Sequence, residues 1–307
     1  MNHSIDEVWI VASPKSGTGA GRHEIDALVT RLNGSGHHCR LTQNIGELAA
    51  RIADPGRSND GLVIVAAGGD GTIGLVAQNA PPEIPLVPMP MGTENLLARH
   101  GGYSSLAVDV EATLRAGKRF KMDAGLANGK MFLVMVTAGM DAEVVRGMHL
   151  TRRGHINRWS YTRPILRAIA RYRYPLITST EQNNSQSDSQ TETPDEVSAC
   201  WMMAFNLPCY AGGLNVEPDA IGDDGLLDLI SLRKGFLWSG LNYLVRIQLG
   251  RHLRHPDVIR RKIRRARWTS PTRVPYQIDG DYAGRLPVEI EVLPERITLL
   301  RPVRAAE

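Results

Sequence analysis

The chain of 307 residues is long enough for roughly two domains of about 100–200 residues each. Its composition, with 42% hydrophobic and 22% charged residues, is that of an ordinary globular protein and excludes a collagen, a coiled coil and a wholly disordered chain. Lysine and arginine exceed aspartate and glutamate by 36 to 32, and the resulting net charge of +4 is too small to identify a partner by itself.

The cysteines and the apolar runs indicate the compartment. Cys39, Cys200 and Cys209 are odd in number and lack C-x-x-C spacing, which excludes a disulfide scaffold and a cysteine-based zinc site and fits a reducing cytoplasm. The first residues are polar, and the longest apolar run, 131–136, is far shorter than the roughly 20 residues of a membrane helix. We therefore expect a cytoplasmic protein that is neither secreted nor embedded in a membrane.

The first part of the chain alternates predicted strands with predicted helices. Short apolar runs predict strands over 8–12, 38–42, 61–67 and 84–87, and helical spacing or position predicts helices over 23–32, 45–52 and 73–78. This alternation is typical of βαβ units and a parallel sheet. In such sheets, ligands bind beyond the carboxyl ends of the strands.

After about Gly125 the pattern changes to strands separated by glycine-rich turns. Strands are predicted over 131–136, 198–206, 226–232, 274–278, 288–292 and 297–300. Few helices lie between them, which favours a second, largely antiparallel domain. Residues 178–198 are poor in apolar side chains and carry only acidic charge, so they are expected to form a disordered loop joining two strands.

Three glycine-containing loops follow the predicted strands of the first domain. The first, residues 13–22, is small and basic, and its glycines allow backbone N–H groups to approach an anion. It is neither a P-loop nor a dinucleotide fingerprint, because no Gly-Lys-Ser/Thr closes it and Arg22 stands where a third glycine would be. A plain linker is an equally common use of such a segment.

The second and third loops are more specific. In residues 68–72, glycines flank Asp70 directly after a buried strand, an arrangement that suits phosphates, with the carboxylate free to bind a metal or to act on a hydroxyl group. Residues 90–95 repeat the pattern one strand later, with Thr93 and Asn95 as hydrogen-bonding side chains. The alternative for the second loop is a purely structural Gly-Asp-Gly turn.

These loops carry a family resemblance. The segments VASPKSGTGAGR, AAGGDGTIGLV and PMPMGTENLLAR resemble the nucleotide-site motifs of the diacylglycerol kinase and sphingosine kinase catalytic family, which shares its fold with NAD kinases. The match continues, in the family's order, through residues 121–125, 218–228 and 274–284.

The resemblance implies an NAD-kinase-like N-terminal α/β domain and a C-terminal antiparallel β-sandwich domain. The expected nucleotide domain covers residues 1–125, with the segment from about 293 to 307 returning to it. The expected lipid-substrate domain covers residues 126–292. ATP would bind between the two.

The resemblance also implies a set of site residues. Those expected to hold the nucleotide are Ser13, Pro14, Lys15, Ser16, Gly17, Thr42, the run Gly69, Asp70, Gly71, Thr72 to Leu75, and Thr93. Asp70, Asp123 and Lys15 would form the charged network around the phosphates. A structural Mg²⁺ would be bound by the side chain of Asp224 and the carbonyls of Ile221 and Leu226, and a second Mg²⁺ would accompany ATP.

The proton acceptor of the family, a glutamate, falls on Asp281, where the shorter side chain reduces its reach. Asp70 is expected to assist it. Leu75 and Leu96 stand where the family has acidic residues, and Leu96 tilts the resemblance towards sphingosine and ceramide kinases. Asp141 resembles the position that holds the substrate headgroup in sphingosine kinases, with an exposed loop acid as the alternative.

We therefore expect an ATP-dependent lipid kinase that phosphorylates a hydroxyl group of a diacylglycerol- or sphingoid-type lipid in phospholipid or lipid metabolism. The alternatives are a catalytically weak nucleotide-binding or lipid-sensing module, favoured by the acid substitutions, and a kinase for a soluble substrate such as NAD. Nucleic acid is not expected as a partner, because no recognised nucleic-acid motif is present. The resemblance leaves room for a homodimer.

A basic stretch, residues 251–267, contains eight arginine and lysine side chains against one acid. Val258, Ile259 and Ile263 lie in it at helical spacing. This pattern predicts a helix that docks transiently on the inner face of the membrane. The alternative is a solvated face, with the apolar residues packed on the β-domain and the arginines in solvent.

Overall fold

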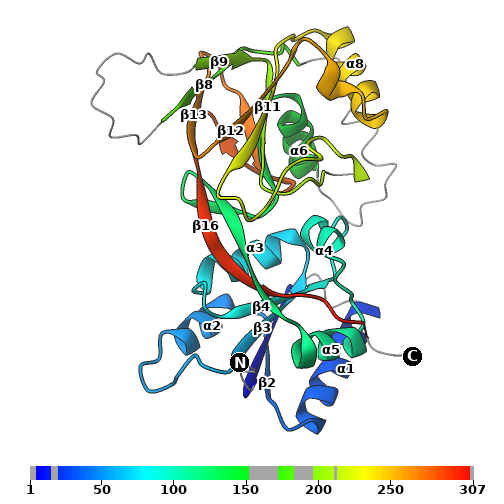
Figure 1. The fold of residues 1–307 in the computed structure, drawn as a ribbon, viewed down its shortest axis with the longest axis vertical. Helices are drawn as coiled ribbons and strands as arrows, with labels where there is room; N and C mark the ends of the chain where they lie inside the picture. The colour runs from blue at the N-terminus through cyan, green and yellow to red at the C-terminus, as the bar shows by residue number, and fades with distance from the viewer. Residues whose placement is uncertain (1–4, 15–19, 152–171, 183–195, 211–212, 305–307) are drawn as a thin grey trace. The chain divides into compact units, whose positions relative to one another are not determined.

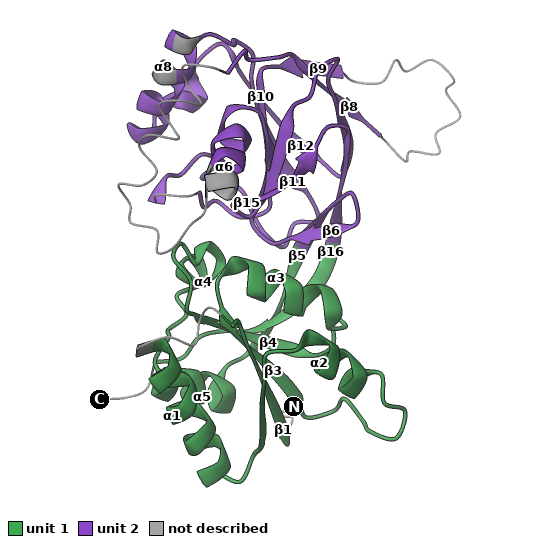
Figure 2. Ribbon diagram, turned by 180° about the vertical axis from the view of Figure 1, so that it is seen from behind, with its two compact units in different colours: residues 1–123, 294–307 green, residues 124–293 purple. Residues whose placement is uncertain are grey.

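The computed structural model describes residues 5–14, 20–151, 172–182, 196–210 and 213–304. The chain divides into two compact units, Met1–Asp123 with Pro294–Glu307, and Ala124–Leu293 (Figure 2). Each unit has its own hydrophobic core.

The first unit is built on a parallel sheet, as the alternation of strands and helices predicts. Its strands lie in the order β2-β1-β3-β4. They are β1 (Glu7–Ala12), β2 (His38–Thr42), β3 (Leu62–Gly68) and β4 (Pro85–Pro90), and the helices that connect them are α1 (Ala20–Gly34), α2 (Ile45–Ile52) and α3 (Asp70–Asn79). The central strand β3, with the sequence LVIVAAG, is buried at every residue, as expected for a parallel strand covered on both faces.

Helices cover both faces of this sheet (Figure 1). Alternate residues of β1, such as Val8 and Ile10, form one core with α1 and with α5 (Ala107–Ala116). The short helix α4 (Leu96–Gly101) follows β4. The next strand, β5 (Arg119–Ala127), runs across the boundary between the two units.

The second unit contains an antiparallel sheet in the order β12-β11-β10-β7-β14-β15. These strands are β7 (Met135–Ala138), β10 (Trp201–Phe205), β11 (Leu227–Leu232), β12 (Val258–Ile263), β14 (Pro275–Ile278) and β15 (Asp281–Arg285). A second layer contains β8 (Ile177–Glu181), β9 (Glu196–Ala199), β13 (Arg265–Thr269) and the first half of β16 (Val288–Leu300). One core joins residues of both layers, among them Met202 and Trp268, so the unit is a β-sandwich.

The remaining elements of this unit are short or peripheral. They are β6 (Lys130–Phe132), α6 (Met140–Thr151), α8 (Leu237–Gln248) and the 3₁₀ turn His252–Arg254.

The basic stretch is the main correction to the sequence analysis. Residues 258–263 form strand β12, paired antiparallel with β11, and not a helix. Ile259 and Ile263 are four residues apart, a spacing that puts side chains on one face of a helix and equally on one face of a strand. Both side chains pack against the sandwich core, and the pairing with β11 makes the segment a strand and not a helix.

Four smaller predictions also change. The strand expected over 131–136 is divided into β6 and β7, and the strand expected over 198–206 is divided into β9 and β10. The loop expected over 178–198 is shorter, because β8 extends to Glu181 and β9 begins at Glu196; residues 183–195 lie outside the described residues. The two strands expected over 288–292 and 297–300 are one strand, β16. It pairs with β13 around Glu291 and with β4 around Thr298, so Pro294 falls between two sets of partners and does not end the strand.

Candidate functional site

The three glycine loops meet at the carboxyl ends of β1, β3 and β4. The N–H of Ser13 donates to the carbonyl of Ala67 at 3.1 Å, and the N–H of Met91 donates to the carbonyl of Gly68 at 2.9 Å. Neighbouring loops are thus connected backbone to backbone. Pro14 is exposed beside Ser13, whereas Lys15, Ser16 and Gly17 lie outside the described residues.

The second and third loops approach too closely for side chains. A Cβ on Gly92 would lie 2.6 Å from the Cα of Gly69, a backbone contact at which only glycine fits. Within the second loop, a Cβ on Gly68 would lie 2.3 Å from Oγ1 of the Thr72 side chain. Gly69 is also the N-cap of α3 and contributes no side-chain cap, so the first turn of α3 can receive an anionic group instead.

Asp70 braces this junction. Its two carboxylate oxygens accept the N–H groups of Leu96, at 2.9 Å, and Leu97, at 3.1 Å, which begin helix α4. The side chain is buried, with 8% of the residue exposed. Burial raises the pKa of the Asp70 carboxyl, and the two backbone hydrogen bonds offset only part of that rise. Asp70 therefore fixes the third loop against the second, a role that sequence reasoning did not assign to it.

Asn95 closes the third loop. Its Oδ1 accepts the N–H of Gly92 and its Nδ2 donates to the carbonyl of the same residue, both at 2.8 Å. The residue adopts a left-handed conformation with φ of 49°, which asparagine tolerates better than most residues. The loop leaves Thr93 exposed. Gly71 is also exposed, and Thr72 is half-buried.

Two other residues expected around the nucleotide form hydrogen bonds within the first unit. The hydroxyl of Thr42 accepts the N–H of Asn44 at 3.0 Å and donates to Glu47 at 3.2 Å, so it shapes the start of α2. Asp123 is 1% exposed, and its Oδ1 accepts the N–H of Glu295 at 2.7 Å.

In the second unit, Asp281 is the first residue of β15 and is exposed. It follows a two-residue turn in which Asp279 and Gly280 have φ of 48° and 87°, the geometry of a tight hairpin. The carboxylate of Asp279 accepts three consecutive N–H groups, those of residues 133–135, at 2.8–3.0 Å. Sequence reasoning missed Asp279, although the Asp-Gly dipeptide after a strand signals such a turn. Its contacts fix the backbone that carries Asp281.

A buried chain of hydrogen bonds leads from this hairpin to Asp141. Gly280 N–H donates to Gln277 Oε1 at 2.7 Å, and Gln277 Nε2 donates to the Thr137 hydroxyl at 2.9 Å. Thr137 donates in turn to Asp141 Oδ2, which also accepts the Tyr210 hydroxyl at 3.0 Å. Gln277, Thr137 and Tyr210 carried no signal in the sequence, because their meaning depends on which strands pair.

Asp141 lies in the first turn of α6 and is buried, so the alternative of an exposed loop acid is wrong. Burial raises the pKa of its carboxyl, and the hydrogen bonds from Thr137 and Tyr210 offset only part of that rise. Its other oxygen, Oδ1, has no hydrogen-bond partner among the described residues.

The residues expected to hold a structural Mg²⁺ do not fit a divalent ion as they stand. Asp224 Oδ1 accepts the N–H of Leu226 at 3.0 Å, and Asp224 Oδ2 accepts from Lys262 Nζ at 2.5 Å. Lys262 also lies 3.9 Å from Asp228. An ammonium group already supplies the positive charge that a metal would bring. Among the described residues, no group of three or more His, Cys, Asp or Glu side chains is placed to hold a metal.

Most cations of the basic stretch are paired with acids. The pairs are Arg260 with Glu217 and Asp219, Arg261 with Glu181, Lys262 with Asp224, Arg265 with Glu291, and Arg267 with Glu289. Arg251, Arg254 and Arg264 are exposed and form no ion pair within the described part of the chain. Strands β12 and β13 are therefore largely neutralised locally.

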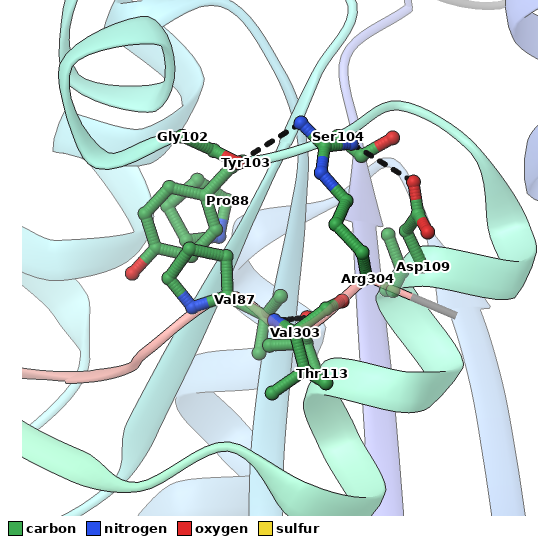
Figure 3. Close-up of a pocket in the computed structure, with 11 residues that line it drawn as sticks. Val87, Pro88, Gly102, Tyr103, Ser104, Asp109, Thr113, Val303 and Arg304 are labelled. Carbon is green, nitrogen blue, oxygen red and sulfur yellow. Dashed lines mark hydrogen bonds and ion pairs between the residues drawn. The ribbon is translucent and has the colours of Figure 1, made fainter. Parts of the chain in front are cut away.

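A shallow hollow elsewhere in the first unit contains none of the predicted site residues. Figure 3 shows that the side chain of Arg304 crosses it and reaches Asp109, at 2.9 Å. Thr113 exchanges hydrogen bonds with the backbone of Val303 in the same place. These contacts fasten the last described residues to α5.

In the described residues, no helix is both long and apolar enough to cross a bilayer.

Comparisons with known proteins match nearly the whole chain. The family model for the diacylglycerol kinase catalytic domain matches residues 7–127. The model for the YegS C-terminal NAD kinase beta sandwich-like domain matches residues 134–301, more than half of the chain.

Individual relatives agree with these matches. The diacylglycerol kinase of Staphylococcus carnosus is 24% identical over 303 residues, covering 95% of this chain and 94% of the relative. That of Staphylococcus aureus strain Newman is 27% identical over 308 residues, covering 95% and 91%. A crystal structure of a diacylglycerol kinase from Bacillus anthracis str. Sterne has a TM-score of 0.70 at 20% identity, covers 98% of both chains, and shows the same fold.

Proposed function

The chain belongs to the family that combines the diacylglycerol kinase catalytic domain with the YegS-type β-sandwich domain, and it is an enzyme of the lipid kinase class. We propose that it transfers the γ-phosphoryl group of ATP to a hydroxyl group of a diacylglycerol- or sphingoid-type lipid. The observation that carries the proposal is the bare-backbone junction of Gly68, Gly69 and Gly92 at the carboxyl ends of parallel strands. This is a place where phosphate groups can approach the backbone.

Phosphoryl transfer depends mainly on positioning and on neutralising charge. We assign the phosphate chain to the loops at residues 13–17, 69–72 and 93, with Mg²⁺ arriving as part of the Mg–ATP substrate. Lys15 would supply the positive charge of the first loop. The uncapped first turn of α3 would add its N–H groups.

We assign Asp70 a positioning role in this reaction. Both of its oxygens are occupied by the N–H groups of Leu96 and Leu97, which argues against a free base. By holding α4, it keeps the third loop at Gly92 against Gly69 of the second loop. The substitution of a family acid by Leu96 does not remove this contact, because Asp70 binds the backbone of that residue.

Asp281 is our candidate for the proton acceptor. Its carboxylate is exposed, and Asp279 fixes the turn on which it stands. A base must be free to reach the acceptor hydroxyl, and Asp281 satisfies this condition.

Asp141 is our candidate for the residue that receives a polar group of the lipid. The carboxyl is buried, and Oδ1 has no hydrogen-bond partner among the described residues, so a lipid hydroxyl or amino group is a suitable partner for it. The hydrogen-bond chain through Thr137 and Gln277 connects this residue to the Asp281 hairpin.

A panel of acceptors tests the proposal. The protein is incubated with γ-labelled ATP and with diacylglycerol, sphingosine or ceramide in detergent micelles, or with NAD in solution. Label in one of the lipids is the expected result. Label in NAD identifies a soluble-substrate kinase, and nucleotide binding without transfer to any acceptor identifies a binding module; either result contradicts the proposal.

A further inference from the structure

Helix α8 (Leu237–Gln248) lies at the edge of the second unit (Figure 1), and it has an apolar face that stays exposed in the part of the chain that the structure describes. Trp238, Val245 and Leu249 are separated by seven and four residues, so they lie on one face of the helix. They are 77%, 49% and 61% exposed, and Phe236, at the N-cap, is 72% exposed. Single exposed apolar residues need no explanation, but four in one place mark a contact surface.

The opposite face of α8 anchors the helix. Tyr243 is 2% exposed and Ile247 is 4% exposed. The Tyr243 hydroxyl accepts the N–H of Lys234 at 3.3 Å, and its ring packs edge-on against His255. The exposed apolar face is therefore not needed to hold the helix in place.

The segment of sequence that contains this helix is rich in cations. Residues 229–256 contain no aspartate or glutamate, whereas Arg233, Lys234, Arg246, Arg251 and Arg254 are all cationic. Lys234 is paired with Asp257 at 3.0 Å. Arg233, Arg251 and Arg254 are exposed and form no ion pair with any described residue.

We propose that this surface, Phe236, Trp238, Val245 and Leu249 with Arg233, Arg251 and Arg254, docks on a bilayer that contains anionic phospholipid. Aromatic and aliphatic side chains enter the interface between headgroups and acyl chains, and arginines bind the phosphates above them. A second copy of the chain fits less well, because pairing two such helices brings like charges together. The inference replaces the helix that the sequence suggested over 251–267.

Docking on a bilayer is separate from phosphoryl transfer, so it is tested in the absence of any kinase reaction. Purified protein is sedimented with vesicles of phosphatidylcholine alone or of phosphatidylcholine and phosphatidylglycerol, over a salt series and without ATP. We expect binding to the anionic vesicles only, weakening as salt rises.

Two variants locate the surface. F236A/W238A removes the exposed rings, and R251Q/R254Q removes two unpaired charges; each is expected to weaken vesicle binding about tenfold or more. The matched controls are Leu106→Ala, an exposed apolar residue of the first unit, and K118Q/R119Q, two exposed cations there. The controls are expected to bind as the unaltered chain does.

A fluorescence measurement gives a second readout. Trp9, Trp201 and Trp268 are buried, and Trp159 lies outside the described residues. Lipids brominated near the headgroup should quench the protein, and W238F should lose most of that quenching.

Equal binding to neutral and anionic vesicles, or full binding by both surface variants, overturns the proposal. So does a change from dimer to monomer in F236A/W238A by light scattering, which would assign the surface to a second copy. Unchanged thermal unfolding and unchanged lipid phosphorylation in detergent micelles separate a docking defect from misfolding and from failure of the proposed kinase activity.

Discussion

For single residues, the surroundings of a side chain determine its role more than its residue type does, as four aspartates show. Asp70 and Asp279 have their oxygens occupied by backbone N–H groups and act as braces. Asp141 is buried, and one of its oxygens has no hydrogen-bond partner in the described part of the chain, whereas Asp281 is exposed. The motifs predicted that the Gly-Asp-Gly and Asp-Gly-Asp segments belong to the functional site. They did not predict which carboxylate has a structural role, because that role depends on backbone N–H donors from distant parts of the chain.

Asp281→Asn tests the proton acceptor. The change keeps the shape of the side chain and removes its basicity, so kcat should fall by about 10²–10⁴-fold. Because Asp281 is exposed, the midpoint of thermal unfolding should not change. Asp281→Glu, which restores the carboxylate, should retain activity, and Asp60→Asn, at an exposed position of the first unit, is the charge-matched control. Turnover by Asp281→Asn equal to that of the unaltered enzyme would exclude Asp281 as the base.

Gly92→Ala tests the junction of the glycine loops. The new Cβ would lie 2.6 Å from the Cα of Gly69, so the loops must separate, at a cost of about 1–3 kcal/mol in the free energy of unfolding. Gly74→Ala is the control, because nothing lies within 4 Å of its Cβ and it is inside helix α3. That variant should be neutral or more stable. Urea unfolding measures both; equal stability of the two variants would contradict the close approach.

The ion pair of Glu7 with the buried Arg51 predicts a pH dependence of stability. Burial of Glu7 raises the pKa of its carboxyl, but the hydrogen bonds and charge of Arg51, at 2.6 Å, outweigh this and lower it below 4.5. Because the folded pKa lies below the unfolded value, the stabilisation is complete above about pH 4.5 and is lost as the pH falls through the folded pKa.

Glu7→Gln should therefore cost about 2 kcal/mol of unfolding free energy near neutral pH, and the difference from the unaltered chain should shrink below about pH 4. The control is Glu47→Gln, which removes an exposed pair with Arg40 and should cost about 0.5 kcal/mol or less. Thermal unfolding across the pH range measures both. A difference that stays constant with pH would show that the charge of Glu7 is not responsible.

At the scale of the element, periodicity predicted most of the first unit and misjudged parts of the second. Strand β2 and helix α2 begin and end where the pattern placed them. Helix α3 begins at Asp70, three residues before the predicted start, because a glycine-rich segment gives no helical signal. Strand β12 resembled a helix because its apolar spacing fits both structures, and only pairing with β11 distinguishes them. Periodicity within a segment cannot show such a pairing, because the partner strand lies elsewhere in the sequence.

The ion pair between Lys262, in β12, and Asp224 yields a prediction about metal binding. Since Lys262 neutralises Asp224, neither EDTA nor added Mg²⁺ should change the thermal unfolding of the protein in the absence of ATP. Lys262→Met should lower the stability by about 1 kcal/mol or less, since the pair is partly exposed, and Mg²⁺ should then recover part of the loss. Lys118→Met, at an exposed position of the first unit, is the control. Unfolding of the unaltered chain at a lower temperature in EDTA would show that a resident metal is bound after all.

At the scale of the whole molecule, the proposed activity depends on both units. We propose that the loops of the first unit bind the phosphates and that the second unit contributes Asp281, Asp141 and the α8 surface. The strands β5 and β16 pass from one unit to the other, so the first unit is made of two segments of the chain and the second unit is the continuous segment between them. The family resemblance predicted this two-part organisation from ordered motifs, whereas the unpaired apolar face of α8 appeared only once the burial of each residue was known.

The most direct test of the proposed lipid kinase activity is to follow the phosphorus atom. The protein, Mg–ATP and diacylglycerol or sphingosine in detergent micelles are observed by ³¹P NMR. We predict that the γ-phosphorus signal declines while a phosphomonoester signal appears in the lipid fraction, and that Asp281→Asn slows both changes together. Conversion of ATP to inorganic phosphate alone, or no loss of the γ-phosphorus signal with any lipid acceptor, would contradict the assignment.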